Sequence, residues 1–237
     1  MAQFAIALDS NGETGAGTLT LGNLGTVKVS GAGVVTIDAS TNANNLVANL
    51  GVTKLKTIDL SGMTAFADLN TLGQEWDGAD VGKYANKSTS TVTLDNQVAE
   101  TVLLGGAKDT VVTGSTIVAV DTVTGFQVVA SVANPLVADA ARSDVLNIGL
   151  NSSTPWTVDN SAKMTVTGTS LEAALLQAAS LTFAGTTNAV NNVLFHFGGD
   201  TYAYQDLGTA GLDDGDVLVK MSGTLNLDLL LTSSTIV

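Results

Sequence analysis

The sequence predicts a mainly β protein in which short strands stack into a β-solenoid, a β-roll or a sandwich, with a few short helices against the core. Three observations predict this fold class. Short segments rich in Thr, Val, Ile and Leu recur along the first half of the chain, each closed by Gly, Asp or Ser. Hydrophobic residues make up 45% of the chain but aromatic residues only 5%, which indicates a core of small aliphatic side chains. The 25 glycines against 2 prolines indicate many turns.

The predicted strands follow one another at short intervals. Between Thr91 and Thr110 they recur roughly every nine or ten residues, which is room for a strand and a turn but not for a helix. This spacing favours stacked coils, each burying its apolar face on the next, and leaves a sandwich open as the alternative. The predicted strands are Thr18–Leu21, Thr26–Val29, Val35–Asp38, Lys56–Leu60, Thr91–Leu94, Thr101–Leu104 and Thr110–Thr113.

Three short helices are predicted where apolar residues lie three and four positions apart. The segments Thr41–Leu50 and Thr64–Leu72 both end before a glycine, which is a common helix stop. The clearest helix is Ser170–Ala179, where Thr169 and Glu172 have the spacing of a capping box.

A change of composition near residues 135–142 predicts a domain boundary. Before it lies a strand-repeat β domain, residues 1–140, and after it a C-terminal β region, residues 141–237. The first residues lack the basic and apolar segments of a signal peptide, so we expect the chain to be the C-terminal part of a longer polypeptide.

Charge and composition exclude several classes of function. The chain carries 22 acidic and 9 basic residues, a net charge of −13. Such a surface repels phosphate backbones and anionic lipid, so no nucleic-acid binding is expected, and it attracts divalent cations such as Ca²⁺. Acidic residues also keep a chain of mean hydropathy +0.32 soluble. The sequence has no stretch of about 20 apolar residues that could span a membrane.

The same residues predict no enzymatic activity. With one histidine and no cysteine, the chain lacks the parts of zinc proteases, Ser-His-Asp triads and Cys-His dyads. His196 alternates with apolar residues and is expected to face outward from a strand. Gly105 and Gly106 are not followed by the Gly-Lys-Ser/Thr of a phosphate-binding loop. Paired-carboxylate glycosidase chemistry stays open, although Trp76 and Trp156 are too isolated to form a sugar platform.

One segment has a pattern typical of calcium binding. Leu104–Val111 resembles a degenerate copy of the glycine- and aspartate-rich nonapeptide of RTX proteins, in which carbonyls and a carboxylate hold Ca²⁺ between coils. The resemblance implies ligands from Asp109 and from the carbonyls of Gly105 and Ala107. An ordinary Gly-Gly turn explains the segment equally well. The further candidate Ca²⁺ ligands are Asp121, Asp144, Asp213, Asp214 and Asp216.

The second half of the chain resembles this family more closely. Asp121–Phe126 followed by Ser143–Ile148 is similar to a strand pair of RTX-type secreted proteins, and Val193–Asp206 is similar to their aromatic Gly-Asp-Thr-Tyr hairpin. The acidic turn Asp213–Asp216 and the strand Val217–Gly223 complete the order. Together these elements resemble the C-terminal region of surface-layer proteins of the Caulobacter and Campylobacter type.

The resemblance implies a secreted structural protein of the bacterial cell surface. Such proteins leave the cell through a type I exporter, using an uncleaved C-terminal signal, which we expect at residues 193–237. It further implies self-assembly into a surface layer with calcium support, and contact with cell-surface polysaccharide through another part of the full chain. The alternative is the calcium-binding and secretion module of an adhesin, or of an exported hydrolase whose catalytic domain lies upstream. Leu227, Leu229 and Leu231 also fit a last strand of the core in place of a signal.

Overall fold

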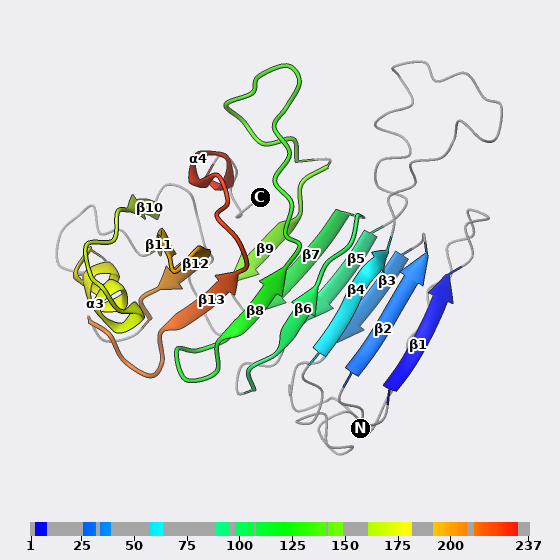
Figure 1. The fold of residues 1–237 in the computed structure, drawn as a ribbon, viewed down its shortest axis with the longest axis horizontal. Coiled ribbons are helices and arrows are strands. Elements are labelled where there is room, and N and C mark those ends of the chain that lie inside the picture. The colour runs from blue at the N-terminus through cyan, green and yellow to red at the C-terminus, as the bar shows by residue number, and fades with distance from the viewer. Residues whose placement is uncertain are drawn as a thin grey trace.

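The computed structural model describes residues 3–8, 26–31, 34–38, 57–63, 89–94, 98–106, 108–140, 142–148, 161–181, 192–207 and 211–231. Within these ranges the protein is mainly β, with a nine-stranded mixed sheet and a four-stranded parallel sheet (Figure 1). The predicted mainly β class is confirmed. The predicted strand Thr18–Leu21 and the predicted helices Thr41–Leu50 and Thr64–Leu72 lie outside the described residues.

Two sheets contain all the strands of the described ranges. In spatial order the larger sheet contains β1 Gln3–Leu8, β2 Thr26–Gly31, β4 Thr57–Met63, β6 Thr101–Leu103, β8 Asp121–Thr124, β13 Val217–Met221, β12 Asp200–Gln205, β11 Asn192–Phe197 and β10 Ser161–Met164. The smaller sheet contains β3 Val34–Asp38, β5 Thr89–Thr93, β7 Lys108–Thr113 and β9 Val145–Ile148. From β2 to β9 successive strands alternate between the sheets, and all pairings among β1 to β9 are parallel.

The two sheets enclose an aliphatic core. Alternate residues of the strands point inward, as the period of two in a β-strand requires. A coil is one strand of the larger sheet together with the next strand of the smaller sheet, for example β6 with β7. The inward side chains of paired strands stack in register, so each strand adds one layer to the core. The layers of the larger sheet include Ile58, Val102 and Val123, and those of the smaller sheet Val92, Val111 and Leu146, none of which is solvent-exposed.

The C-terminal strands change direction. β11 and β12 form an antiparallel hairpin, as the sequence predicts, and its turn contains Gly198 and Gly199 at φ of 61° and 89°. β12 pairs antiparallel with β13, which returns to the parallel strands by pairing with β8. Pairings β7–β9 and β8–β13 therefore join residues on both sides of the predicted boundary near residue 140. The division of the chain there stays a prediction.

The helix α3, Leu171–Leu181, lies where the sequence predicts one. Its buried stripe consists of Ala174, Leu175, Ala178 and Ala179. The predicted capping box is one residue early, because the helix begins at Leu171. Ser170 is therefore the N-cap, and its Oγ accepts a hydrogen bond from the Ala173 amide at 3.1 Å.

The short helix α4, Leu227–Leu230, forms where the alternative interpretation of this segment had a last strand. Asn226 caps it, since its Oδ1 accepts hydrogen bonds from the amides of Asp228 and Leu229 at 3.0 and 3.4 Å. Leu229 and Leu230 are adjacent in sequence and both buried, which an alternating strand does not allow. The described part of the chain contains no helix long and apolar enough to cross a membrane.

Candidate functional site

Four of the predicted site residues are aspartates without solvent exposure, Asp109, Asp121, Asp144 and Asp216. Each lies at or next to the first residue of a strand. A buried carboxylate is costly unless it is hydrogen-bonded. Each of these four carboxylates accepts hydrogen bonds from amide or hydroxyl groups of the protein.

Asp121, at the start of β8, accepts hydrogen bonds from residues next to β6 and in β7. Its Oδ1 accepts a hydrogen bond from the Glu100 amide, the residue before β6, at 2.9 Å. Its Oδ2 accepts one from the hydroxyl of Thr113 at the end of β7, at 2.6 Å. The carboxylate thus satisfies a backbone donor of the previous coil and holds the corner between the sheets.

Asp109 and Asp144 form the corresponding contact in the smaller sheet. Asp144 Oδ1 accepts a hydrogen bond from the Asp109 amide at 2.9 Å, and its Oδ2 accepts one from the Gln127 amide at 2.7 Å. Asp109 Oδ1 accepts a hydrogen bond from the Ser90 hydroxyl, one coil further away. Asp109 Oδ2 is buried, and no described residue forms a hydrogen bond of normal geometry with it.

Burial changes the proton affinity of this pair. Desolvation raises the pKa of Asp109, against the Ser90 hydroxyl and the Gly105 amide, which lower it. Desolvation also raises the pKa of Asp144 to about 7, and the nearby Asp109 carboxylate adds to the rise. Two buried acids side by side therefore favour retention of a proton near neutral pH.

Asp216 closes the acidic turn in front of β13. It accepts hydrogen bonds from the Tyr204 hydroxyl at 2.6 Å and from the amides of Leu207 and Asp213 at 3.0 Å each. Burial raises the pKa of Asp216 and that of Tyr204. Asp213 accepts a hydrogen bond from the Gly215 amide at 2.8 Å, while Asp214 is solvent-exposed.

Gly105 occupies a contact between coils. A Cβ atom there would lie within 3.0 Å of the carbonyl oxygens of Leu60 and Met63, so only glycine allows this approach. Its carbonyl accepts a hydrogen bond from Gln127 Nε2 at 3.1 Å, and the next amide, Gly106, donates to Met63 at 2.8 Å. Ala107, the other predicted carbonyl ligand, lies outside the described residues.

The predicted ligands do not converge on one point. Gly105, Asp109 and Asp144 lie at one end of the smaller sheet, Asp121 starts a strand of the larger sheet, and the 213–216 turn is separate. Ca²⁺ takes about six to eight oxygen ligands. Among the described residues no group of three or more His, Asp or Glu side chains could hold a metal ion. The residues of the described ranges therefore do not form a complete calcium site.

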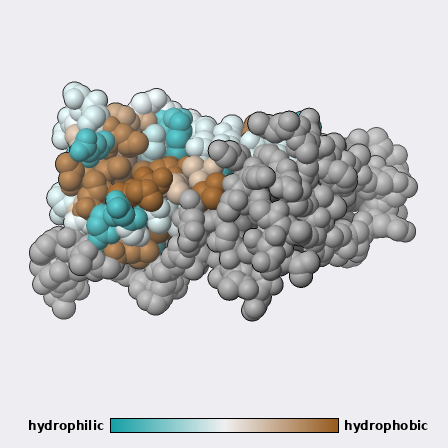
Figure 2. All heavy atoms as spheres, turned by 90° about the horizontal axis from the view of Figure 1, so that it is seen from below, coloured by the Kyte–Doolittle hydropathy of each residue, from teal (hydrophilic) through white to brown (hydrophobic). Residues whose placement is uncertain are grey.

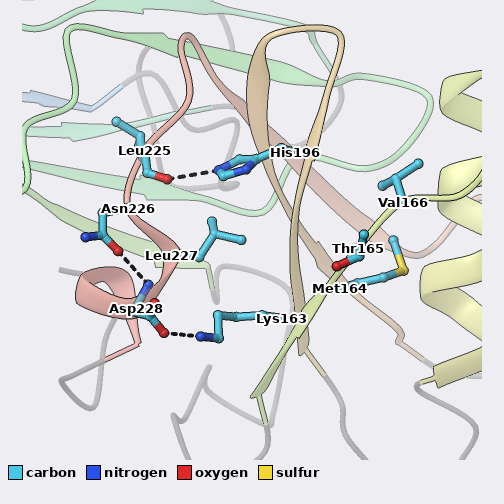
Figure 3. A pocket seen from close by; sticks show the side chains of 9 residues that line it. All are labelled: Lys163, Met164, Thr165, Val166, His196, Leu225, Asn226, Leu227 and Asp228. Atoms are coloured by element: carbon cyan, nitrogen blue, oxygen red, sulfur yellow. Dashed lines mark hydrogen bonds and ion pairs between the residues drawn. The ribbon is translucent and has the colours of Figure 1, made fainter.

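His196 lies in a pocket beside α4 rather than on an open strand face (Figure 3). The side chain is half-buried, and its Nε2 forms a hydrogen bond with the Leu225 carbonyl at 2.9 Å. Lys163 and Asp228 form an ion pair at the pocket rim. This hydrogen bond connects β11 to the segment before α4, which is a structural role for His196.

Sequence reasoning missed one feature, an arm formed by residues 127–140 and 142–143. Its two sides pair through the Ala130–Ala138 bridge, and Asp139 donates a backbone hydrogen bond to Val129 at 2.7 Å. Figure 1 shows this segment projecting from the sheets between β8 and β9. The Asn134-Pro135 dipeptide, a common turn signal between aliphatic residues, could have indicated it.

Comparison with protein-family models finds no match, and a search of curated proteins finds no relative of this chain.

Proposed function

We propose that this protein is a non-enzymatic structural component of a bacterial surface layer, built as a β-solenoid that associates with further copies of itself. The observation that carries the proposal is the alternation of β2 to β9 between the two sheets, with parallel pairing throughout this part of the chain. In such an array each coil contacts only its neighbours, and the end strands present unpaired backbone groups to a partner. Elongated stacks of this kind suit a lattice better than a catalytic cleft.

The use of the polar residues supports a structural role. Asp121, Asp144 and Asp216 accept backbone amides. His196 bonds a carbonyl. The polar groups that usually perform catalysis thus hold the fold in the described part of the chain.

Calcium support is the second part of the proposal. The buried Oδ2 of Asp109 lacks a hydrogen bond of normal geometry from the described residues, and a bound cation would compensate its negative charge. Asp144 lies beside it and carries a second negative charge when ionised. A bound cation would relieve the repulsion between the two carboxylates.

A calcium titration followed by thermal unfolding and light scattering tests both parts. Binding to the native state alone stabilises by about 2.7 kcal/mol at a hundredfold excess over Kd. We expect calcium to raise the melting temperature and the particle size, with magnesium a poor substitute because it demands tighter octahedral geometry. Asp109→Asn should lose the response, and Asp214→Asn, at an exposed position, should keep it. Equal melting temperature and size in chelator and in millimolar calcium would contradict the proposal.

Export through a type I exporter is the third part. The support is the resemblance of the hairpin of β11 and β12, and of the turn before β13, to those of secreted RTX-type proteins. Residues 193–237 fused to a slow-folding passenger should leave a cell that carries a matching exporter. Retention of this passenger, while a fusion to the whole chain is secreted, would place the signal elsewhere.

A further inference from the structure

The arm ends in an exposed apolar tip, residues 132–137. All six positions are exposed, and Asn134 is the single polar residue among them. The side chains of Val132 and Leu136 are 90% and 78% exposed. Consecutive exposed apolar residues are uncommon on a soluble monomer and mark a contact surface.

The backbone of the tip forms hydrogen bonds within the tip itself. The Ala133 amide donates to Ser131 Oγ at 3.3 Å. The amides of Leu136 and Val137 donate to the side chain and to the carbonyl of Asn134 at 3.1 and 3.0 Å. The proline of the tip has no amide hydrogen to satisfy. Because an apolar environment offers an unpaired amide no water, such internal hydrogen bonds lower the cost of entering it.

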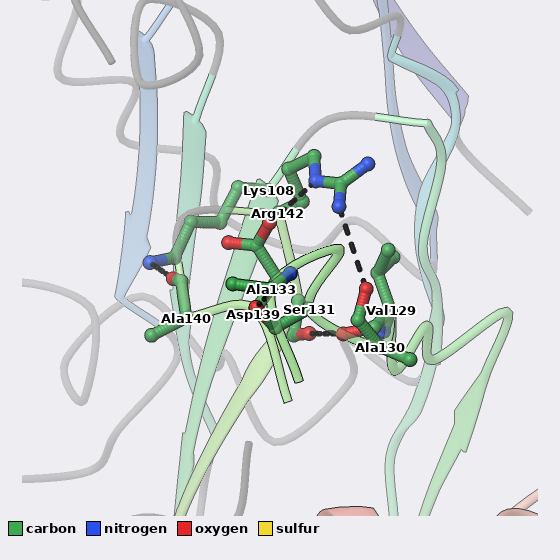
Figure 4. A network of polar contacts seen from close by, with 9 residues as sticks. Lys108, Val129, Ala130, Ser131, Ala133, Asp139, Ala140 and Arg142 are labelled. Atoms are coloured by element: carbon green, nitrogen blue, oxygen red, sulfur yellow. Dashed lines mark hydrogen bonds and ion pairs between the residues drawn. The ribbon is translucent and has the colours of Figure 1, made fainter. Parts of the chain in front are cut away.

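The charged side chains nearest to the tip along the chain lie at the base of the arm and are paired (Figure 4). Arg142 forms an ion pair with Asp139 at 2.7 Å, and Lys108 donates a hydrogen bond to the Ala140 carbonyl. Residues 127–138 carry no charge. The tip can therefore leave water without taking an ionised side chain with it, while the ion pair at the base stays hydrated.

The tip is too small to hold a protein partner by itself. Its five apolar side chains expose on the order of a few hundred Å². A stable protein interface buries about 800 Å² on each partner. Figure 1 shows the arm projecting from the sheets with no described helix or strand beside its tip, so the fold does not enlarge this contact. A fluid lipid surface accepts such a projection without a matching shape, and binding to it scales with the apolar area buried.

The net charge of the chain indicates which lipid surface fits. A molecule of charge −13 is repelled by anionic headgroups. Zwitterionic headgroups carry no net charge, so they do not oppose insertion of an uncharged tip. Charge therefore favours a zwitterionic bilayer over an anionic one, and over a second copy of this acidic chain.

A second apolar surface on the molecule lacks these features. Figure 2 shows hydrophobic side chains gathered at the end of the molecule that carries α3. Leu176 and Leu181 of α3 are 55% and 46% exposed. The exposed residues Glu172 and Ser180 lie one turn before and one turn after Leu176, so this face of the helix is mixed in polarity. Nothing in the structure identifies what would cover it, and it carries no proposal.

We propose that the tip of the arm inserts into the surface of a lipid bilayer with zwitterionic headgroups and holds the protein there reversibly. Apolar surfaces of this kind enter about 5–10 Å into the boundary between headgroups and acyl chains. The inference goes beyond the proposed function and does not depend on self-association.

The absence of cysteine from the chain allows a direct test. Val132→Cys is labelled with an environment-sensitive fluorophore and mixed with phosphatidylcholine vesicles. We expect the emission to shift to the blue and to increase, because the label leaves water. The control is the same label on Val118→Cys, which is 71% exposed outside the arm and should not respond.

Two outcomes of the labelling experiment would overturn the proposal. One is no change at position 132, or an equal change at both positions, when vesicles are added. The other is a blue shift at position 132 that grows with protein concentration in the absence of vesicles and is unaffected by lipid, which would assign the tip to a second copy of the chain.

A charge substitution tests the same contact without a label. We expect Val132→Asp with Leu136→Asp to weaken sedimentation with phosphatidylcholine vesicles about tenfold or more, since two carboxylates would have to leave water. The melting temperature of this variant should not change, because both positions are exposed. Val118→Asp should bind vesicles like the native chain.

The lipid composition provides a further control. Replacing about a third of the phosphatidylcholine by phosphatidylglycerol should weaken binding at low salt, and added salt should reverse the loss. Tighter binding to the anionic vesicles that the arm variant retains would mean adsorption through another surface, and the proposal would be wrong. Light scattering without vesicles measures self-association separately, so failure of the insertion and failure of the proposed function are distinguishable.

Discussion

The parallel and the antiparallel regions of the molecule use the same residue type over different distances. In the parallel region, β1 to β9, Asp121 accepts hydrogen bonds from groups 21 and 8 residues away, and Asp144 from amides 35 and 17 residues away. In the antiparallel region, formed by β11, β12 and β13, Asp216 accepts hydrogen bonds from groups 3, 9 and 12 residues away, in β12 and in the connection from β12 to β13. A buried aspartate before a strand joins successive coils in the first region and shapes a turn in the second.

The cores of the two regions also differ in the size of their side chains. The parallel region contributes mainly Val, Ile and Leu, one layer from each coil. The antiparallel region contains aromatic side chains, and Phe195 and Tyr202 stack with ring centroids 5.4 Å apart. Small aliphatic side chains can form the same layer on strand after strand of a parallel stack. Large aromatic rings fill a core that is not repeated, as in the antiparallel strands.

The largest expected effect tests the turn in the antiparallel region. Asp216→Ala leaves the Tyr204 hydroxyl and two amides buried without an acceptor, which should cost about 3 kcal/mol or more in the free energy of unfolding. Asp214→Ala in the same exposed turn should change stability by no more than about 0.5 kcal/mol. Urea unfolding measures both. A small effect of Asp216→Ala would mean that the turn is not held by this carboxylate.

Gly105→Ala tests the close contact of coils in the parallel region. The added methyl group would meet the backbone carbonyls of Leu60 and Met63, which cannot move without disturbing strand pairing, so we expect a loss of about 2–3 kcal/mol. The control is Gly199→Ala, where no atom lies within 4 Å but φ is +89°, so only backbone strain of about 1–2 kcal/mol arises. If both substitutions cost the same, the coils are not in tight contact at Gly105.

These residues show why part of the molecule could be predicted from the sequence. The strands and α3 follow from local alternation, β-branched content and apolar spacing, which act within a few residues. The role of Asp121 and Asp144 could not be predicted, because the amides they bind are brought to them by the stacking of coils. For the same reason the sequence left a calcium ligand and an ordinary turn both open at Gly105 and did not indicate its close contact with the carbonyls of Leu60 and Met63. The alternative of a last strand at Leu227–Leu231 followed the alternation of leucines, whereas Asn226 before them is a local N-cap signal for the helix α4.

The pH dependence of stability should distinguish buried from exposed carboxylates. Burial, with help from Asp109, raises the pKa of Asp144 from 3.8 to about 7. The native state then binds more protons than the unfolded state between these values. The free energy of unfolding should therefore fall as pH rises from about 4 to 7, by at most about 1.4 kcal/mol per pH unit for one proton.

This experiment is best done in chelator, so that no cation competes with the proton. Asp144→Asn should flatten the slope between pH 5 and 7 while lowering stability overall, because an amide cannot accept both backbone hydrogen bonds. An unchanged slope in this variant would assign the titration to another group. Asp200 provides the opposite case, since its hydrogen bonds from Lys220 and the Gly223 amide lower its pKa. Its contribution should be lost only as pH falls through the acidic range below about 4.

The smallest expected effect comes from two matched ion pairs, one in each region. Lys28 and Asp59 join β2 to β4 in parallel at 2.6 Å, and Lys220 and Asp200 join β13 to β12 antiparallel at 2.7 Å. Each aspartate also accepts one nearby amide, at 3.0 and 2.9 Å, and all four side chains are partly exposed.

Because solvent screens such pairs, Asp59→Asn and Asp200→Asn should each cost about 0.2–1 kcal/mol, less at high salt, whichever way the strands run. Urea unfolding at low and high salt measures both. If Asp59→Asn lowers the free energy of unfolding several times more than Asp200→Asn does, exposed ion pairs also stabilise the pairing of the parallel strands. The parallel region would then depend on its surface as well as on its buried aspartates.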